Sequence, residues 1–239
     1  MLRALADRAA RVVVGYQRWD DILFLHWPVP LDAVRARVDR RLEVDLFDGR
    51  AFVSLTPFSV RAARLRGTPR LPLVSDFHEL NFRTYVRRGS GEPGVWFFSL
   101  DAASAVASAL ARVGLGLPYF VARMERGTDG PAREFRSRRV LTTRPVSFAA
   151  RWTAGELVPD PPGSLTHFLV ERYALYSTYA GRLLRVRVRH PPWVLRDARV
   201  ERMDETLIDA AGMTAMSDRP LAQASAGVDV EFFPPELLA

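Results

Sequence analysis

Residues 76–86, DFHELNFRTYV, decide the fold because polar and apolar side chains alternate along them. Alternation with a period of two is typical of a β-strand, whose successive side chains point to opposite faces. One face would carry Glu79, Asn81, Arg83 and Tyr85, and the side chains between them would face an apolar core. The stretch therefore predicts a strand with one polar and one apolar face.

The polar face of this strand has two interpretations. In a closed barrel it can point inward and line a ligand cavity with an acid, an amide, a guanidinium and a phenol. In an open sheet it faces water, and Glu79 and Arg83 form an ordinary ion pair. Taken alone, the alternation favours the second interpretation.

Strands are predicted on both sides of this stretch, at residues 22–27, 43–47, 51–60, 95–100, 119–126, 132–141, 145–152, 168–177 and 182–190. The segments 43–47 and 51–60 read as a hairpin across Asp48-Gly49. Helical spacing is rarer and predicts helices at 2–14, 31–42, 102–113 and near 205–211. The helix at 102–113 has small apolar side chains and is expected to pack closely on a sheet.

The order of these elements indicates the fold class. Strands dominate, and no regular alternation with helices occurs, so the sheets are expected to be mostly antiparallel. Residues 1–239 are expected to form one α+β domain, with residues 1–17 as a helical extension.

The composition is that of an ordinary globular protein. Of 239 residues, 48% are hydrophobic and 26% are charged. Charges interrupt each apolar run before it reaches the roughly 20 residues that span a bilayer. Residues 1–20 carry frequent arginines and lack the apolar core of a signal peptide. A cytoplasmic protein without a membrane partner is expected.

Two residue types are missing. Without cysteine, disulfides, thiolate nucleophiles and thiolate metal ligands are excluded. There is also no lysine, so all 34 Lys and Arg positions are arginine. Arginine stays protonated and is no amine nucleophile, so no lysine side chain of this protein can form a Schiff base.

The formal net charge of +7 raises the question of nucleic-acid binding. The arginines are spread along the chain among 27 acids, and the densest run, Arg182–Arg189, alternates with apolar residues. That pattern is typical of the solvent face of a half-buried strand. No nucleic-acid partner is expected.

The histidines show no metal-ligand spacing. They are His26, His78, His167 and His190. No nucleophile elbow is present, and no glycine-rich loop opens a helix, so no metal and no cofactor are expected. His26 ends an apolar run and is expected to be a hydrogen-bonded core residue, with a functional role as the alternative.

Several short strings carry a family resemblance. They are His26-Trp27-Pro28-Val29-Pro30, Glu79-Leu80-Asn81, Gly94 to Asp101, Leu117-Pro118-Tyr119, Glu171-Arg172-Tyr173 and His190-Pro191-Pro192-Trp193. On these strings the chain resembles the YqjF-like family of uncharacterised bacterial proteins, in the acetoacetate decarboxylase-like superfamily. The resemblance implies a cone-like or barrel-like, mostly antiparallel sheet with a few short helices around a largely apolar pocket.

The superfamily's catalytic motif is altered. Acetoacetate decarboxylases carry G-R-E-x-x-G-[YF]-P-K-K, whose first lysine forms the Schiff base and whose second lowers its pKa. Residues 111–120 read ARVGLGLPYF: the Arg, Gly and Pro are kept, and Tyr119 and Phe120 replace the lysines. Without an amine, a ketone cannot become an iminium electron sink. Decarboxylation by that mechanism is excluded.

The resemblance also implies a site. Glu79 lies upstream of this motif much as an acid does in the decarboxylases, so it is expected to face inward. Tyr119 would then donate a hydrogen bond to a carbonyl or carboxylate, and Arg83 or Arg112 would pair with an anionic group. Arg112 has an alternative role at a helix C-terminus. The expected ligand-binding residues are Glu79, Asn81, Arg83, Arg112, Tyr119, Phe120 and His26, and Glu79 and Tyr119 would be catalytic in an enzyme.

Three functions are open. The first is binding of a small carbonyl or carboxylate compound. The second is lysine-independent catalysis on such a compound, with Glu79 as acid or base. The third is a structural or interaction protein whose 14 Phe and 5 Trp side chains fill the pocket. A small molecule is the expected partner, and homo-oligomerisation is left open.

Overall fold

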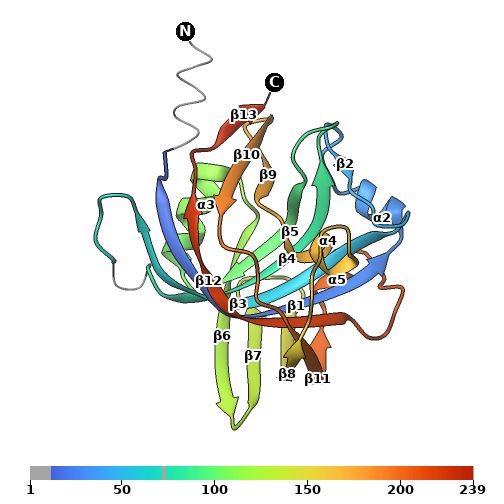
Figure 1. The fold of residues 1–239 in the computed structure, drawn as a ribbon. Helices are drawn as coiled ribbons and strands as arrows, with labels where there is room; N and C mark the ends of the chain where they lie inside the picture. Colours follow the sequence, from blue (N-terminus) through green and yellow to red (C-terminus); the bar gives the residue numbers. More distant parts are fainter. Residues whose placement is uncertain (1–11, 72–73, 239) are drawn as a thin grey trace.

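The computed structural model describes residues 12–71 and 74–238, which form one curved 13-stranded sheet with short helices around it (Figure 1). The strands are β1 (Gly15–Val29), β2 (Glu43–Val44), β3 (Ala51–Leu65), β4 (Phe77–Arg87), β5 (Gly94–Ala102), β6 (Tyr119–Asp129), β7 (Ala132–Arg139), β8 (Ser147–Leu157), β9 (Ala174–Tyr179), β10 (Arg182–Arg189), β11 (Arg196–Glu205), β12 (Leu221–Phe232) and β13 (Glu236–Leu238). The helices are α2 (Leu31–Arg35), α3 (Ala105–Leu115), α4 (Leu165–Val170) and α5 (Leu207–Ala210). None of the described helices has the length and apolarity needed to cross a membrane.

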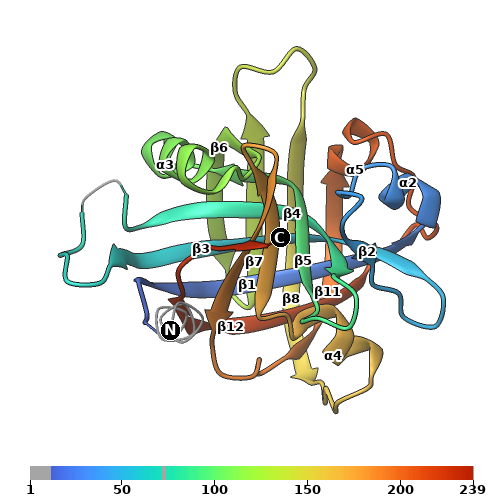
Figure 2. The same cartoon turned by 90° about the horizontal axis from the view of Figure 1, so that it is seen from above.

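The sheet branches and closes on itself. Its order is β13-β10-β9-β5-β6-β7-β8-β11-β12-β1-β3-β4-β2, with additional pairings of β10 with β12 and β5 with β4. Strand β5 pairs with β9 at one end and β6 at the other, and these are the parallel pairs among the described strands. Two rings therefore share β5, β4, β3, β1 and β12. In Figure 2, β1 and β3 run horizontally, while β7 and β8 run vertically. The expected mostly antiparallel α+β fold is confirmed.

The shared strands separate two apolar cores. Leu80 and Phe82 of β4 belong to the core that Phe135 and Trp152 of β7 and β8 complete. Tyr85 belongs to the other core, with side chains from β5 and β10. Strand β4 thus has the predicted period-two alternation, and both of its faces are buried. Each large apolar side chain buried in this way contributes roughly 1.5–3 kcal/mol.

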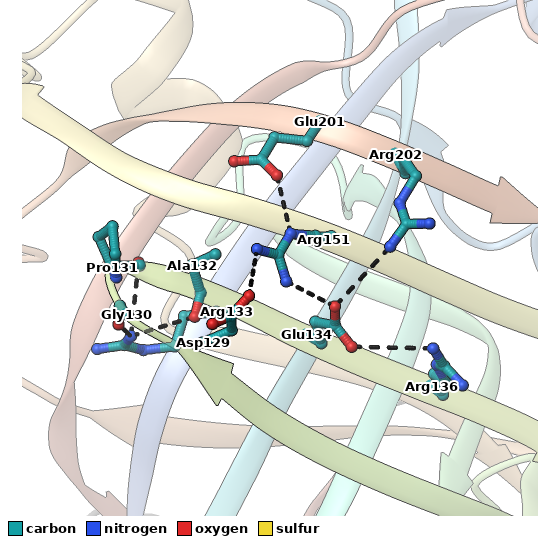
Figure 3. A network of polar contacts seen from close by, with 10 residues as sticks. All are labelled: Asp129, Gly130, Pro131, Ala132, Arg133, Glu134, Arg136, Arg151, Glu201 and Arg202. Atoms are coloured by element: carbon teal, nitrogen blue, oxygen red, sulfur yellow. Dashed lines mark hydrogen bonds and ion pairs between the residues drawn. The ribbon is translucent and has the colours of Figure 1, made fainter.

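Many arginines are paired with acids on the outer faces of strands. Figure 3 shows Arg151 of β8 reaching Glu134, Asp129 and Glu201, each at 2.8–2.9 Å. On β10, Arg185 and Arg187 both pair with Glu236. The apolar side chains between these arginines are buried, so β10 is the half-buried strand that the alternation predicts.

Helix α3 connects β5 to β6 in the chain and lies next to β6 in Figure 2. The Ser104 side chain accepts a hydrogen bond from Ala107 N at its start, and Gly116 ends it in the left-handed conformation with φ +63°. A Cβ at Gly116 would lie 2.3 Å from the carbonyl oxygen of Thr178, so glycine permits the close approach of β9. The expected close packing of this helix is only partial, since Leu110 is 64% and Val113 72% exposed.

The predicted helix at 31–42 is much shorter in the structure. Helix α2 ends at Arg35, whose guanidinium donates hydrogen bonds of 2.7 Å to the carbonyls of Val38 and Asp39. These bonds hold a compact turn in place of further helix, and Val38 and Leu42 still become buried. The apolar spacing therefore predicted the burial of Val38 and Leu42 correctly, but it predicted a helix that is too long.

Three other expectations need correction. The predicted strand 168–177 begins within α4, because Ser164 accepts a hydrogen bond from His167 N and caps a helical turn. The predicted hairpin 43–60 is reduced to its turn: Phe47 and Arg50 form an antiparallel bridge across Asp48-Gly49, while β2 pairs with β4 and not with β3. Residues 15–17 of the expected N-terminal extension begin β1, while residues 1–11 of its helix lie outside the described residues.

Candidate functional site

A cavity of about 590 Å³ lies inside the ring that β9 and β10 close. Apolar side chains from several strands and α3 form most of its wall, including Phe24, Phe58, Phe97, Leu110, Val186 and Val188. Strand β4 contributes three polar side chains in a row, Glu79, Asn81 and Arg83. The polar face of β4 therefore lines a cavity, which is the inward alternative of the two interpretations.

Among the described residues that line the cavity, Glu79 is the only one with an acidic side chain, and it is only 5% exposed. Burial raises its pKa from the usual 4.5 to about 7. Hydrogen bonds from Tyr119 and Asn81 oppose this rise, and the negative charge of Asp101 adds to it. Near neutral pH Glu79 therefore populates both forms and can accept or donate a proton.

Tyr119 approaches Glu79 from the first residue of β6. Its hydroxyl donates a hydrogen bond of 3.1 Å to Glu79 Oε2. The backbone positions the ring, since Leu100 N donates to the Pro118 carbonyl at 3.0 Å and ties the start of β6 to β5. Burial and the charge of Glu79 raise the pKa of Tyr119 well above its usual value, so its phenol stays a neutral donor.

Arg83 and Asn81 carry polar atoms without partners. Arg83 is 9% exposed, and neither its Nε nor its Nη2 makes a hydrogen bond; the Oδ1 of Asn81 also has no partner. Burial lowers the pKa of Arg83, but a guanidinium stays protonated near neutral pH. Among the described residues, no carboxylate pairs with it. The cavity thus holds a buried positive charge with two unsatisfied donors.

Arg172, His190 and Trp193 also line the cavity, close to Arg83. Arg172 has its own acid, since its Nη1 lies 2.6 Å from Asp45 Oδ2. Burial lowers the pKa of His190, and the buried Nε1 of Trp193 has no partner. None of these three residues was predicted to belong to the site. They lie in the strings 171–173 and 190–193, which carry the family resemblance and could have indicated them.

Three of the expected ligand-binding residues lie elsewhere. His26 is fully buried and is not among the lining residues of the cavity. Its Nδ1 and the Tyr85 hydroxyl are 2.9 Å apart, and burial and the charge of Arg83 lower its pKa to about 3. Arg112 is exposed in the last turn of α3. Phe120 points outward beneath the guanidinium of Arg139, because neighbouring residues of a strand face opposite sides.

The arrangement brings together an acid with a pKa of about 7, a phenol donor, an amide oxygen without a partner and a guanidinium whose Nε and Nη2 have no partner. A guanidinium can bind a carboxylate through two parallel hydrogen bonds. Within residues 12–71 and 74–238, no group of three His, Asp or Glu side chains is placed to hold a metal ion. Such groups are chemically able to bind an anion and to transfer a proton.

The fold is shared with solved structures of known enzymes. The structure is similar to an acetoacetate decarboxylase-like enzyme from Sphingomonas wittichii RW1, with a TM-score of 0.65 and 14% identity over 95% of this chain and 94% of that chain. It is also similar to the enduracididine biosynthesis enzyme MppR complexed with pyruvate, with a TM-score of 0.66 and 15% identity over 95% and 91% of the two chains. The chain has an acetoacetate decarboxylase-like fold.

Within that class the family is clear. Residues 16–229 match the DUF2071 family, described as an uncharacterized conserved protein, and the chain belongs to this family. It is 38% identical over 218 residues to the uncharacterized protein YqjF of Bacillus subtilis (strain 168), covering 91% of this chain and 90% of YqjF. The resemblance inferred from the sequence is confirmed.

Proposed function

We propose that the protein binds a small carboxylate or carbonyl compound in the cavity over β4. The observation that carries this proposal is the buried guanidinium of Arg83, whose Nε and Nη2 have no partner. An unpaired charge in an apolar environment costs several kcal/mol, and a ligand carboxylate would remove much of that cost. The free Oδ1 of Asn81 would accept a hydrogen bond from the ligand.

The fold neighbours support the same class of ligand. MppR, which shares this fold, was solved in complex with pyruvate, a keto carboxylate. The present chain has no lysine, so any carbonyl would be bound without a lysine Schiff base. Hydrogen bonds from Tyr119 and Arg83 are the available substitutes.

A second proposed function is proton transfer on the same compound. Glu79, with a pKa near 7, would remove a proton from the carbon beside a carbonyl, and the electron pair would move toward the carbonyl oxygen. The Tyr119 hydroxyl would donate a hydrogen bond to the developing oxyanion. Return of the proton from Glu79 would complete the cycle. The 3.1 Å contact between the two side chains favours this candidate.

The third function, a structural protein with a self-filled pocket, has less support. Its aromatic side chains line the cavity but leave about 590 Å³ open.

Binding is tested by calorimetric titration with pyruvate, acetoacetate and butyrate at pH 7. The wild type is expected to bind at least one of them, and Arg83→Met to bind it at least tenfold more weakly. Arg112→Met is the matched control, since it makes the same substitution at an exposed position outside the cavity. Equal binding by wild type and Arg83→Met, or no binding by the wild type at millimolar concentration, contradicts the proposal.

Proton transfer is tested by NMR in D₂O with the same two keto acids. The wild type is expected to accelerate exchange of the protons beside the carbonyl, and Glu79→Gln to abolish the acceleration. An undiminished rate in Glu79→Gln, or no acceleration by the wild type, contradicts the second function and leaves the binding proposal intact.

A further inference from the structure

We infer that the ligand is a medium-chain amphipathic carboxylic acid rather than a three- or four-carbon keto acid. This inference rests on the proposed function, because it places the carboxylate on Arg83. It adds the chemical nature of the part of the ligand beyond the carboxylate. This follows from the size of the cavity, the positions of its polar groups and the location of its opening.

The cavity is too large for a small keto acid. At about 30 Å³ per water molecule in the liquid, its 590 Å³ corresponds to about 20 water molecules. Pyruvate and acetoacetate have only about six or seven non-hydrogen atoms and would leave most of this space unfilled. Cavities of this size in proteins hold drug-sized ligands.

The polar groups are spread along the cavity. Consecutive residues of a strand rise about 3.3 Å, so the Cα atoms of Glu79 and Arg83 are roughly 13 Å apart along β4. The guanidinium of Arg83 lies over the ring of Phe24 and close to Tyr85 and Arg172. A ligand that contacts both Arg83 and the Glu79–Tyr119 pair must therefore be considerably longer than pyruvate.

Apolar side chains line the space between these two polar ends. Phe97 and Leu100 of β5 and Val186 and Val188 of β10 belong to this wall. A methylene chain fits this surface, because it needs no hydrogen bonds and gains from burial. Arg83 is the permanently charged end of this space, so the cavity complements an amphipathic acid whose carboxylate lies on Arg83 and whose chain extends along the apolar wall toward the Glu79–Tyr119 pair.

The opening of the cavity is apolar as well. Leu110 of α3 lines the cavity and is nonetheless 64% exposed, so the cavity reaches solvent beside this helix. Val106 and Val113, one turn away on either side of Leu110, are 54% and 72% exposed. An apolar chain that enters or protrudes there would contact these leucine and valine side chains.

The test compares calorimetric titrations with butyrate and octanoate at pH 7. At about a fourfold gain per buried methylene, octanoate is expected to bind more than tenfold more tightly than butyrate. Arg83→Met should weaken both acids at least tenfold. Ala107→Phe, which places a ring in the cavity wall at α3, should weaken octanoate at least tenfold and leave butyrate unchanged. Ala109→Phe is the matched control on the exposed side of the same helix.

The outcomes separate this inference from the proposed function. If both acids bind equally and both depend on Arg83, the inference is overturned and the proposed function stands. If neither acid binds, the inference is overturned, and the proposed function then rests on the titrations with pyruvate and acetoacetate. If octanoate binds more tightly but is indifferent to Arg83→Met and Ala107→Phe, it binds elsewhere, and the inference is overturned.

Discussion

Replacing Glu79 by glutamine should stabilise the protein at alkaline pH and not at acidic pH. Glutamine has nearly the same shape and keeps an oxygen that can accept the hydrogen bond from Tyr119. The substitution therefore removes the buried negative charge and little else. Because Glu79 is only 5% exposed, the charge is costly wherever it is ionised.

The magnitude follows from the pKa of Glu79. Its folded-state pKa of about 7 lies above the unfolded value near 4.5, so the folded protein binds more protons between these pH values and loses stability as the pH rises through them. At about 1.36 kcal/mol per pH unit, the difference amounts to about 3 kcal/mol above pH 7 and vanishes below pH 4.5. For a chain of this length, about 3 kcal/mol raises the Tm by roughly 6–12 °C.

Urea unfolding of wild type and Glu79→Gln at pH 5, 6, 7 and 8 provides the assay. The difference in unfolding free energy should be small at pH 5 and grow to about 3 kcal/mol in favour of glutamine at pH 8. A difference independent of pH would refute the reasoning. So would a wild type that is the more stable at pH 8, since the cavity would then stabilise the carboxylate.

Three further substitutions have definite expected outcomes. Arg83→Met removes an unpaired buried charge and should raise the unfolding free energy by about 1–3 kcal/mol in urea titrations. Gly116→Ala, at φ +63° and facing the Thr178 carbonyl, should lower the Tm through a loss of about 3 kcal/mol, and an unchanged Tm would contradict the described contact. Asp101→Asn leaves the buried Arg139 guanidinium without its ion pair and should cost about 3 kcal/mol by the same titration; a neutral effect would argue against that pair.

The fold was largely predictable because its elements are periodic. Strand β4 follows from the alternation in residues 76–86, and the strand predicted at 95–100 is its antiparallel partner β5. The length of the helix after Pro30 was not predictable from spacing, because the side chain of Arg35 bonds the carbonyls of Val38 and Asp39 and holds a turn there. A local hydrogen bond from a long side chain leaves no periodic trace in the sequence.

The candidate site was predictable only in part. Alternation placed Glu79, Asn81 and Arg83 on one face, but whether that face meets water or a cavity depends on ring closure by β9 and β10. The proximity of Tyr119 to Glu79 was suggested by the family motif alone. That Arg83 lacks an acid while Arg172 has Asp45 depends on contacts across more than 100 residues, which no local pattern records.

A crystal structure of the protein with 8-bromooctanoate tests the central claim most directly. The account predicts the carboxylate within hydrogen-bonding distance of Arg83 Nε and Nη2, and the anomalous peak of the bromine inside the cavity, toward Tyr119 and α3. A carboxylate bound away from Arg83, or a bromine peak outside the cavity, would contradict it.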